Sequence, residues 1–203
     1  SELAAGDPRY PALLSALETA LDSIPGPLHL CGLSLGGVLA MDYALRHPKR
    51  VASLVLCGTP LTMPRNLLRL QDFLFRLMPE RAFAGSGFSR EAMRQLAGSM
   101  AELDLRPRLP ELSCPVLVLC GSKDRANRKA ARELAEQLPQ ARLHWIAGAG
   151  HEANLDSPEV MADCPRRIIL PVNDGRLIAI NAENGKLCET FANKGVLNLQ
   201  SNM

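Results

Sequence analysis

The sequence lacks several patterns that would assign the protein to a particular class. Its six cysteines include no Cys-x-x-Cys pair, and His and Cys do not recur at the short spacing of a metal site. There is no Gly-rich loop followed by Lys and Ser or Thr, as in phosphate-binding loops. The 23 basic and 21 acidic residues nearly balance, and no apolar run approaches the length of a membrane span. We therefore expect no cofactor, no metal, and no nucleic-acid or membrane partner; no signal peptide is visible.

The composition allows a folded domain with reduced thiols. A chain of 203 residues with 47% hydrophobic content can bury one sizeable core. Cys31, Cys57 and Cys120 fall at the ends of apolar runs expected to be buried strands, where a small thiol packs well. This placement favours reduced cysteines over a disulfide framework and predicts a cytoplasmic protein.

Ser34 stands in the motif Gly32-Leu33-Ser34-Leu35-Gly36, between an apolar run (27–31) and a helix-like run (37–46). A strand that stops at such a serine and turns at once into a helix exposes the hydroxyl at the tip of a sharp turn, where glycines avoid collisions. Ser34 is therefore a candidate nucleophile. The motif is short enough to occur by chance, so an ordinary Gly-Ser turn is the alternative until its context is considered.

Two later segments place a carboxylate and an imidazole after further strand-like runs. The apolar run 115–121 leads to Asp124, and the run 142–146 leads through a loop of small residues to His151. The chain order Ser34, Asp124, His151 is that of serine hydrolases built on an α/β sheet.

These three residue types perform one chemistry together. A serine hydroxyl is a weak nucleophile, so a neutral imidazole, here His151, must accept its proton during attack on an acyl carbon. The imidazolium that forms needs a buried carboxylate, here Asp124, to orient it and offset its charge. The backbone N–H of Leu35, at the start of the following helix, is the oxyanion donor that this segment can offer.

Other polar residues are weaker candidates. His29 and His144 lie inside apolar runs and are expected to be core or sheet-face residues. His47 lies in a polar turn and is expected to be a solvated loop residue. Asp156 and Asp163 do not follow a strand-like run.

Residues 8–161 resemble the α/β-hydrolase superfamily, and within it the small esterases and enol-lactonases. Four blocks in the right order carry the resemblance: Leu30-Cys31-Gly32-Leu33-Ser34-Leu35-Gly36-Gly37, His47-Pro48-Lys49-Arg50-Val51 with the strand Leu54–Leu56, Cys114 to Asp124, and Gly148-Ala149-Gly150-His151. The resemblance implies a cofactor-free hydrolase acting on a small-molecule ester or lactone, with Ser34, Asp124 and His151 as its triad.

The family pattern is incomplete at the amino-terminal end. Its members carry about four strands, and the loop supplying a second oxyanion N–H, before the nucleophile strand. Here residues 1–26 contain one predicted helix, 11–21, and no strand-like run. We therefore predict a truncated α/β-hydrolase domain over residues 1–163, with half of the expected sheet absent.

The segment 61–112 would form a cap over the active site in this family. Two amphipathic helices are predicted in it, one ending before Pro79 and one capped by Ser89. The first carries Leu67, Leu70, Leu74 and Leu77, and the second carries Met93, Leu96, Ala97 and Met100. Such stripes are compatible with an apolar acyl or alcohol pocket, and they are also typical of plain core packing.

Residues 164–203 have a different composition, rich in Ile, Val and Asn. Asn173-Asp174-Gly175 separates the runs 167–172 and 176–180, which predicts a β-hairpin, and a further run follows at 187–191. Residues 170–181 and 193–199 resemble part of a propeller blade of membrane-bound pyrroloquinoline-quinone glucose dehydrogenases. One partial blade cannot form a quinone site, so neither cofactor nor activity is transferred. A chimera is the simplest account, and a natural β extension is the alternative.

Together these observations predict an α/β fold with about four parallel strands (27–146), flanking helices, a short helical cap and a β-hairpin tail. The strand that contains His29 would be an exposed edge, which invites pairing with the hairpin or with a second copy. On this ground we predict a homodimer or larger assembly. Two functions follow: a serine esterase or lactonase, or a catalytically impaired chimera whose main property is self-association.

Overall fold

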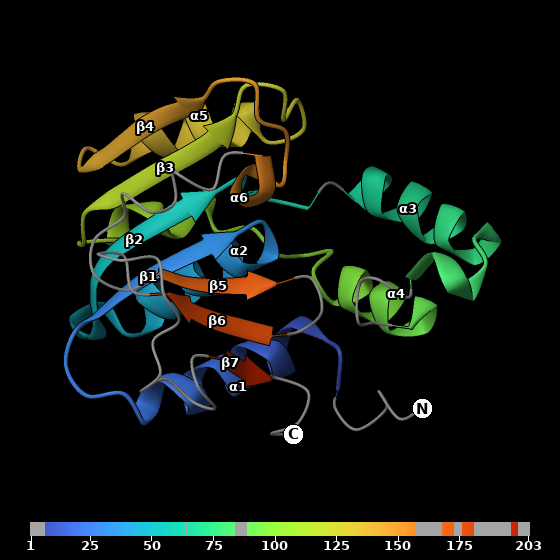
Figure 1. The fold of residues 1–203 in the computed structure, drawn as a ribbon, viewed down its shortest axis with the longest axis horizontal. Helices are drawn as coiled ribbons and strands as arrows, with labels where there is room; N and C mark the ends of the chain where they lie inside the picture. Colours follow the sequence, from blue (N-terminus) through green and yellow to red (C-terminus); the bar gives the residue numbers. More distant parts are fainter. Residues whose placement is uncertain are drawn as a thin grey trace.

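The computed structural model describes residues 7–63, 65–83, 89–156, 168–172, 176–180 and 196–198. Its main sheet is parallel, with the strands in the order β1-β2-β3-β4 (Figure 1). The strands are β1 (Leu28–Leu33), β2 (Val51–Cys57), β3 (Val116–Gly121) and β4 (Ala141–Ile146). The predicted sheet of four parallel strands is confirmed.

The register of the sheet places the carboxyl ends of the strands side by side. Leu33 pairs with Cys57, Cys57 pairs with Leu119, and Gly121 pairs with Ile146. Parallel strands connected through helices all end at the same edge of the sheet. The residues that follow the four strands therefore meet at that edge, as ligand sites of open parallel sheets do.

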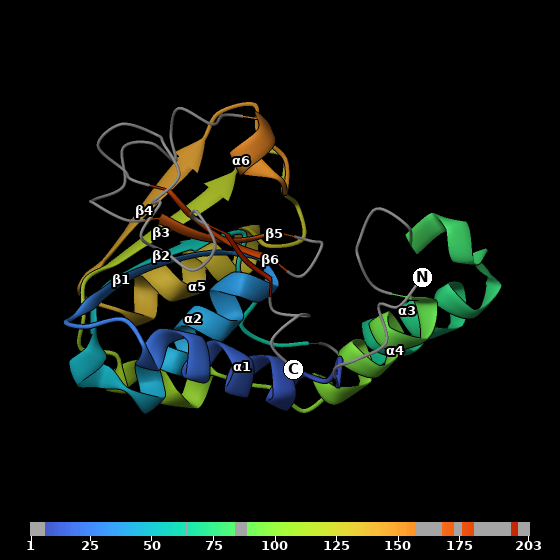
Figure 2. The ribbon, with the colours of Figure 1, turned by 60° about the horizontal axis from the view of Figure 1, so that its bottom comes forward.

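Helices α1 (Tyr10–Asp22), α2 (Leu35–Arg46) and α5 (Arg128–Gln137) lie on one face of this sheet (Figure 2). The buried leucines of α1 pack with α2 and with alternate residues of the strands in the main core. A smaller cluster covers the opposite face near the carboxyl edge and includes Ala153 of the short helix α6 (Ala153–Asp156). The apolar runs of β1, β2 and β3 are explained by this burial on both faces.

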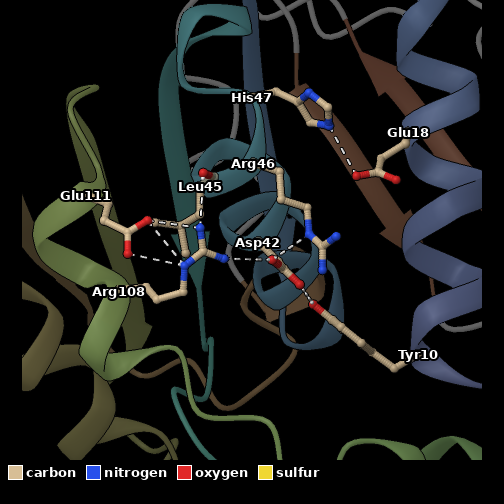
Figure 3. Close-up of polar contacts among 8 residues, drawn as sticks. All are labelled: Tyr10, Glu18, Asp42, Leu45, Arg46, His47, Arg108 and Glu111. Atoms are coloured by element: carbon tan, nitrogen blue, oxygen red, sulfur yellow. Dashed lines mark hydrogen bonds and ion pairs between the residues drawn. The ribbon is translucent and has the colours of Figure 1, made fainter.

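A buried carboxylate, Asp42 of α2, joins the elements on the helical face (Figure 3). The Tyr10 hydroxyl of α1 donates to its Oδ2 at 3.0 Å, and Arg46 Nε donates to its Oδ1 at 3.0 Å. Arg108, in the 3-10 segment η3 (Arg106–Glu111), lies 3.7 Å from the same oxygen. Burial, followed by the nearby Asp42 carboxylate, raises the pKa of Tyr10. The phenol therefore stays protonated and donates to the carboxylate.

His47 has more contacts than its position in a polar turn suggested. Its Nε2 lies 3.1 Å from Oε1 of Glu18 on α1 (Figure 3). The centroid of its ring lies 4.6 Å from that of Tyr43. The side chain is 36% exposed. The difference arises because α1 packs beside the end of α2, a contact that the local sequence does not reveal.

The segment 61–112 contains two longer helices, α3 (Arg65–Leu77) and α4 (Arg90–Ser99), with the 3-10 segment η2 (Glu80–Phe83) between them. Ser89 caps α4 as predicted, because its Oγ accepts from the Ala92 N–H at 3.1 Å. Arg94 of α4 pairs with Asp72 of α3 at 2.6 Å. The two helices project together from the sheet and its helices (Figures 1 and 2).

The apolar stripes of α3 and α4 have different surroundings. On α4, Leu96 is 6% exposed, and Met100 just beyond the helix is 3% exposed. On α3, Leu68 is 9% exposed, whereas Leu70 is 54%, Phe73 57%, Leu74 47% and Leu77 69% exposed. Core packing thus accounts for Leu96 and Met100 and does not account for the exposed apolar side chains of α3.

The tail contributes an antiparallel sheet of β5 (Ile168–Val172), β6 (Arg176–Ile180) and β7 (Val196–Asn198). The first two strands are those of the predicted hairpin, with Val172 paired to Arg176. β5 lies beside β1, at the edge of the main sheet (Figure 1). The predicted run 187–191 and the turn 173–175 lie outside the described residues.

None of the helices in the described ranges is long and apolar enough to span a membrane.

Candidate active site

Ser34 occupies a strained turn between β1 and α2. Its φ of 52° and ψ of −118° make it the one non-glycine among the described residues with a positive φ. Its N–H donates to the carbonyl of Cys57 at 2.8 Å. Backbone strain of this kind is held by the surrounding structure and is frequent at functional sites. The turn therefore has the geometry of a nucleophile elbow.

Two glycines allow this turn to form. A Cβ on Gly32 would lie 2.3 Å from the carbonyl carbon of Gly36. A Cβ on Gly37 would lie 1.9 Å from Oγ1 of Thr59, which follows β2. Both distances are far inside van der Waals contact, so the close approach of the strand, the helix and the neighbouring loop requires glycine at both positions.

Asp124 and His151 contact each other beyond the ends of β3 and β4. Nδ1 of His151 lies 2.9 Å from Oδ2 of Asp124. The Asp124 side chain is 3% exposed, and the His151 side chain is 43% exposed. Because an ionised carboxylate only accepts hydrogen bonds, Nδ1 is the donor, and the lone pair of the neutral ring is on Nε2. This tautomer is the one that a general base needs.

The loops that hold these two residues are joined backbone to backbone. The Lys123 N–H donates to the carbonyl of Ala149 at 2.9 Å. Gly121 has no room for a side chain, because a Cβ there would lie 2.1 Å from the carbonyl oxygen of Gly150. Asp156, one of the weaker candidates, has a different place: its Oδ2 accepts from the Gly150 N–H at 2.7 Å. It therefore secures the loop that leads to the histidine.

Gly58 connects the serine turn with the acid and the imidazole. It follows Cys57, whose carbonyl accepts from Ser34, and its φ is +51°. A Cβ at this position would lie 3.1 Å from both Oδ2 of Asp124 and Nδ1 of His151. The Asp124–His151 pair therefore packs directly over the end of β2, next to the end of β1 where Ser34 lies. The sequence signal for this role was an apolar strand that ends in Cys57-Gly58.

The pKa of Asp124 reflects opposing effects. Burial alone would raise it, but hydrogen bonds from His151 and from Asn127 outweigh burial, so the pKa lies below the ordinary carboxyl value. Asn127 donates from Nδ2 to both carboxylate oxygens, at 3.1 Å to Oδ1 and 2.9 Å to Oδ2. Sequence reasoning did not identify Asn127. Its only signal was its position three residues after the acid, at the start of a helix-like run.

Leu35 is the first residue of α2. The first N–H groups of a helix have no acceptor within it, so this N–H is an available donor beside Ser34. The remaining histidines lie elsewhere. His29 Nδ1 is 2.7 Å from Oγ of Ser53 within the sheet, and His144 is exposed on β4. Within the described ranges no three His, Cys, Asp or Glu side chains gather as a metal ion would need.

Two family models match the chain. The model described as the alpha/beta hydrolase family covers residues 4–164. The model described as the beta-propeller domain of glucose/ethanol/alcohol dehydrogenase covers residues 136–203. Both resemblances inferred from the sequence are therefore confirmed.

Curated relatives divide in the same way. The pimeloyl-(acyl-carrier protein) methyl ester esterase of Aromatoleum aromaticum is 31% identical over 199 residues, which cover 77% of this chain and 78% of that protein. The quinoprotein glucose dehydrogenase of Escherichia coli is 91% identical over 55 residues, 26% of this chain. This chain spans 7% of the length of that dehydrogenase.

Solved structures share the fold. The esterase from Exiguobacterium antarcticum superposes with a TM-score of 0.68 at 20% identity, and the match covers 77% of this chain and 72% of that one.

Proposed function

Because the chain belongs to the alpha/beta hydrolase family, we propose that it is a serine hydrolase that cleaves a carboxylic ester or lactone through an acyl-enzyme. The observation that carries the proposal is the 2.9 Å contact between His151 Nδ1 and the buried Asp124 carboxylate, at the sheet edge where Ser34 occupies a strained turn. The methyl ester esterase named among the relatives supports an ester as the substrate class.

In the proposed reaction, Ser34 Oγ attacks the acyl carbon while Nε2 of His151 accepts its proton. The new C–O bond forms as the carbonyl π bond opens, and the Leu35 N–H donates to the oxyanion. The carbonyl re-forms, the ester C–O bond breaks, and the alkoxide leaves with the proton from His151. A water then repeats the sequence on the acyl-enzyme and releases the acid. Asp124 stays ionised throughout and orients the ring.

The test is hydrolysis of short-chain p-nitrophenyl esters by the wild type and by Ser34→Ala. Loss of the nucleophile should abolish the burst of p-nitrophenol. It should also reduce the hydrolysis rate to the residual level that the remaining binding groups support without a nucleophile. Ser15→Ala is the matched control, because Ser15 is an exposed serine on α1, remote from the site. Equal rates for wild type and Ser34→Ala would remove the enzyme proposal.

The second candidate function is self-association by a catalytically impaired chimera, with the hydrolase-like domain over residues 1–163 and the β tail over 164–203. The accessible apolar side chains of α3 favour it, since contiguous exposed apolar surface often marks interaction sites. The position of β5 beside β1 weighs against pairing of β1 with a second copy, because the chain's own tail is next to that edge.

Sedimentation velocity distinguishes the assemblies. A homodimer or larger species at micromolar concentration would support self-association, and a single species of 22.0 kDa would contradict it. Cytoplasmic location stays a prediction; the buried free thiols of Cys114 and Cys120 support it.

A further inference from the structure

Asn127 is the residue that makes the most contacts with the Asp124 carboxylate. Its side-chain Nδ2 donates to Oδ1 at 3.1 Å and to Oδ2 at 2.9 Å, and its backbone N–H donates to Oδ1 at 3.3 Å. The same Nδ2 lies 3.1 Å from Nδ1 of His151, a close approach and not a hydrogen bond, because both nitrogens carry hydrogens that are directed at Asp124. Asn127 is 9% exposed, so these contacts are shielded from water.

The orientation of the amide follows from the chemistry of its neighbour. Turned over, the Asn127 carbonyl would face a carboxylate that can only accept hydrogen bonds, so the NH₂ group must be the part that faces Asp124. A carboxylate held at both oxygens cannot rotate about its Cβ–Cγ bond without breaking these bonds. Oδ2 therefore stays directed at His151, and the ring proton stays on Nδ1.

The charged side chains of the same turn do not replace this contact. Lys123 and Arg125 are exposed. The Arg128 guanidinium lies over the ring of Trp145, 5.6 Å from its centroid. The side chain that contacts the Asp124 carboxylate is thus the neutral amide of Asn127 and not a cation. It orients the carboxylate without adding a charge beside His151.

We propose that Asn127 is a positioning residue of this active site, which holds the Asp124 carboxylate in the rotation that fixes the His151 tautomer. The inference rests on the proposed function and adds to it the residue that acts through the acid. Asn127 touches neither the nucleophile nor the acyl group in this role. It acts only on the Asp124–His151 pair. Removal of its side-chain amide should therefore change kcat and the pH profile while KM stays unchanged.

The test compares Asn127→Leu, which keeps similar volume without a donor, with Asn127→Ser, which keeps one hydroxyl donor. One hydrogen bond to an ionised group corresponds to about a tenfold to hundredfold change in kcat when its loss is expressed in the transition state. We expect kcat to fall by that factor in the leucine variant, with KM unchanged, and to recover largely in the serine variant. Ala126→Ser, at the exposed neighbouring position, should behave as wild type.

The pH profile separates positioning from loss of structure. Without the amide donors the carboxylate is more basic and holds the imidazolium proton more tightly. The acidic limb of kcat/KM should therefore move to higher pH in Asn127→Leu. A leucine variant with wild-type kcat and pH profile, or a serine variant as slow as the leucine variant, would overturn the proposal.

A second readout does not depend on turnover. The His151 ring resonance, assigned by its loss in His151→Gln, can be titrated by NMR in wild type and in both Asn127 variants. A His151 titration that moves to higher pH in Asn127→Leu supports the positioning role. This holds even if the wild type hydrolyses no ester, a result that would contradict only the proposed function. An unmoved titration in an active enzyme overturns the role of Asn127 and leaves the proposed function standing.

Discussion

Gly58→Ala places a methyl group between the strand end and the acid–base pair. The new Cβ would lie 3.1 Å from Oδ2 of Asp124 and from Nδ1 of His151. These distances are tighter than ordinary van der Waals contact, so one or both groups must move by a few tenths of an ångström. The glycine also has φ +51°, a left-handed conformation that an alanine adopts at a cost of about 1–2 kcal/mol. Two effects are therefore expected, one on stability and one on catalysis.

Gly26→Ala isolates the first effect. Gly26 has φ +81°, and a Cβ there would meet nothing within 4 Å. Both variants should lose about 1–2 kcal/mol of unfolding free energy from backbone strain, measured by urea denaturation at pH 7. Only Gly58→Ala should also lower kcat on p-nitrophenyl esters, by about tenfold to a hundredfold, because displacement of catalytic groups by even 1 Å can cost about a hundredfold.

The comparison can refute the reasoning in two ways. If Gly58→Ala keeps wild-type kcat while losing stability like Gly26→Ala, the Asp124–His151 pair does not take part in turnover. If both variants lose activity in proportion to their fraction unfolded, strain alone explains the loss. Rates measured well below the unfolding transition of each variant keep the two effects apart.

Two further outcomes concern charges in the interior. Tyr10→Phe removes a buried hydrogen bond to the Asp42 carboxylate and should lower the unfolding free energy by about 1–3 kcal/mol. The value of kcat should stay unchanged, since the bond joins α1 to α2 away from the site. An unchanged urea midpoint would show that the remaining partners of Asp42 suffice. Because the folded pKa of Asp124 lies below its unfolded value, its ionised form stabilises the fold above the ordinary carboxyl pKa of about 4, and that stabilisation is lost as pH falls through the folded value. Urea unfolding of wild type from pH 7 down to pH 3 should show this loss, and Asp124→Asn should lack it; parallel curves would place the effect on other carboxyls.

Much of the chain's architecture is encoded locally. The apolar runs before Ser34 and Asp124 form the parallel strands β1 and β3 of one sheet, because continuous β-branched and leucine-rich runs are stable only where both faces are covered. The leucine spacing of α1 and the Ser89 cap of α4 likewise depend on residues within one or two turns of helix. The strand order brings the three candidate residues to one sheet edge.

The tertiary structure alone decided which groups touch. Asn127 contacts the Asp124 carboxylate because it lies at the start of the helix after β3, where its side-chain amide faces Asp124. Gly58 lies under the Asp124–His151 pair because of the register of β2 with β3. His47 reaches α1, and β5 lies beside β1, through contacts between segments far apart in the chain. Such contacts depend on register and packing summed over the whole molecule, whereas periodicity reports only what a residue's near neighbours in sequence can form.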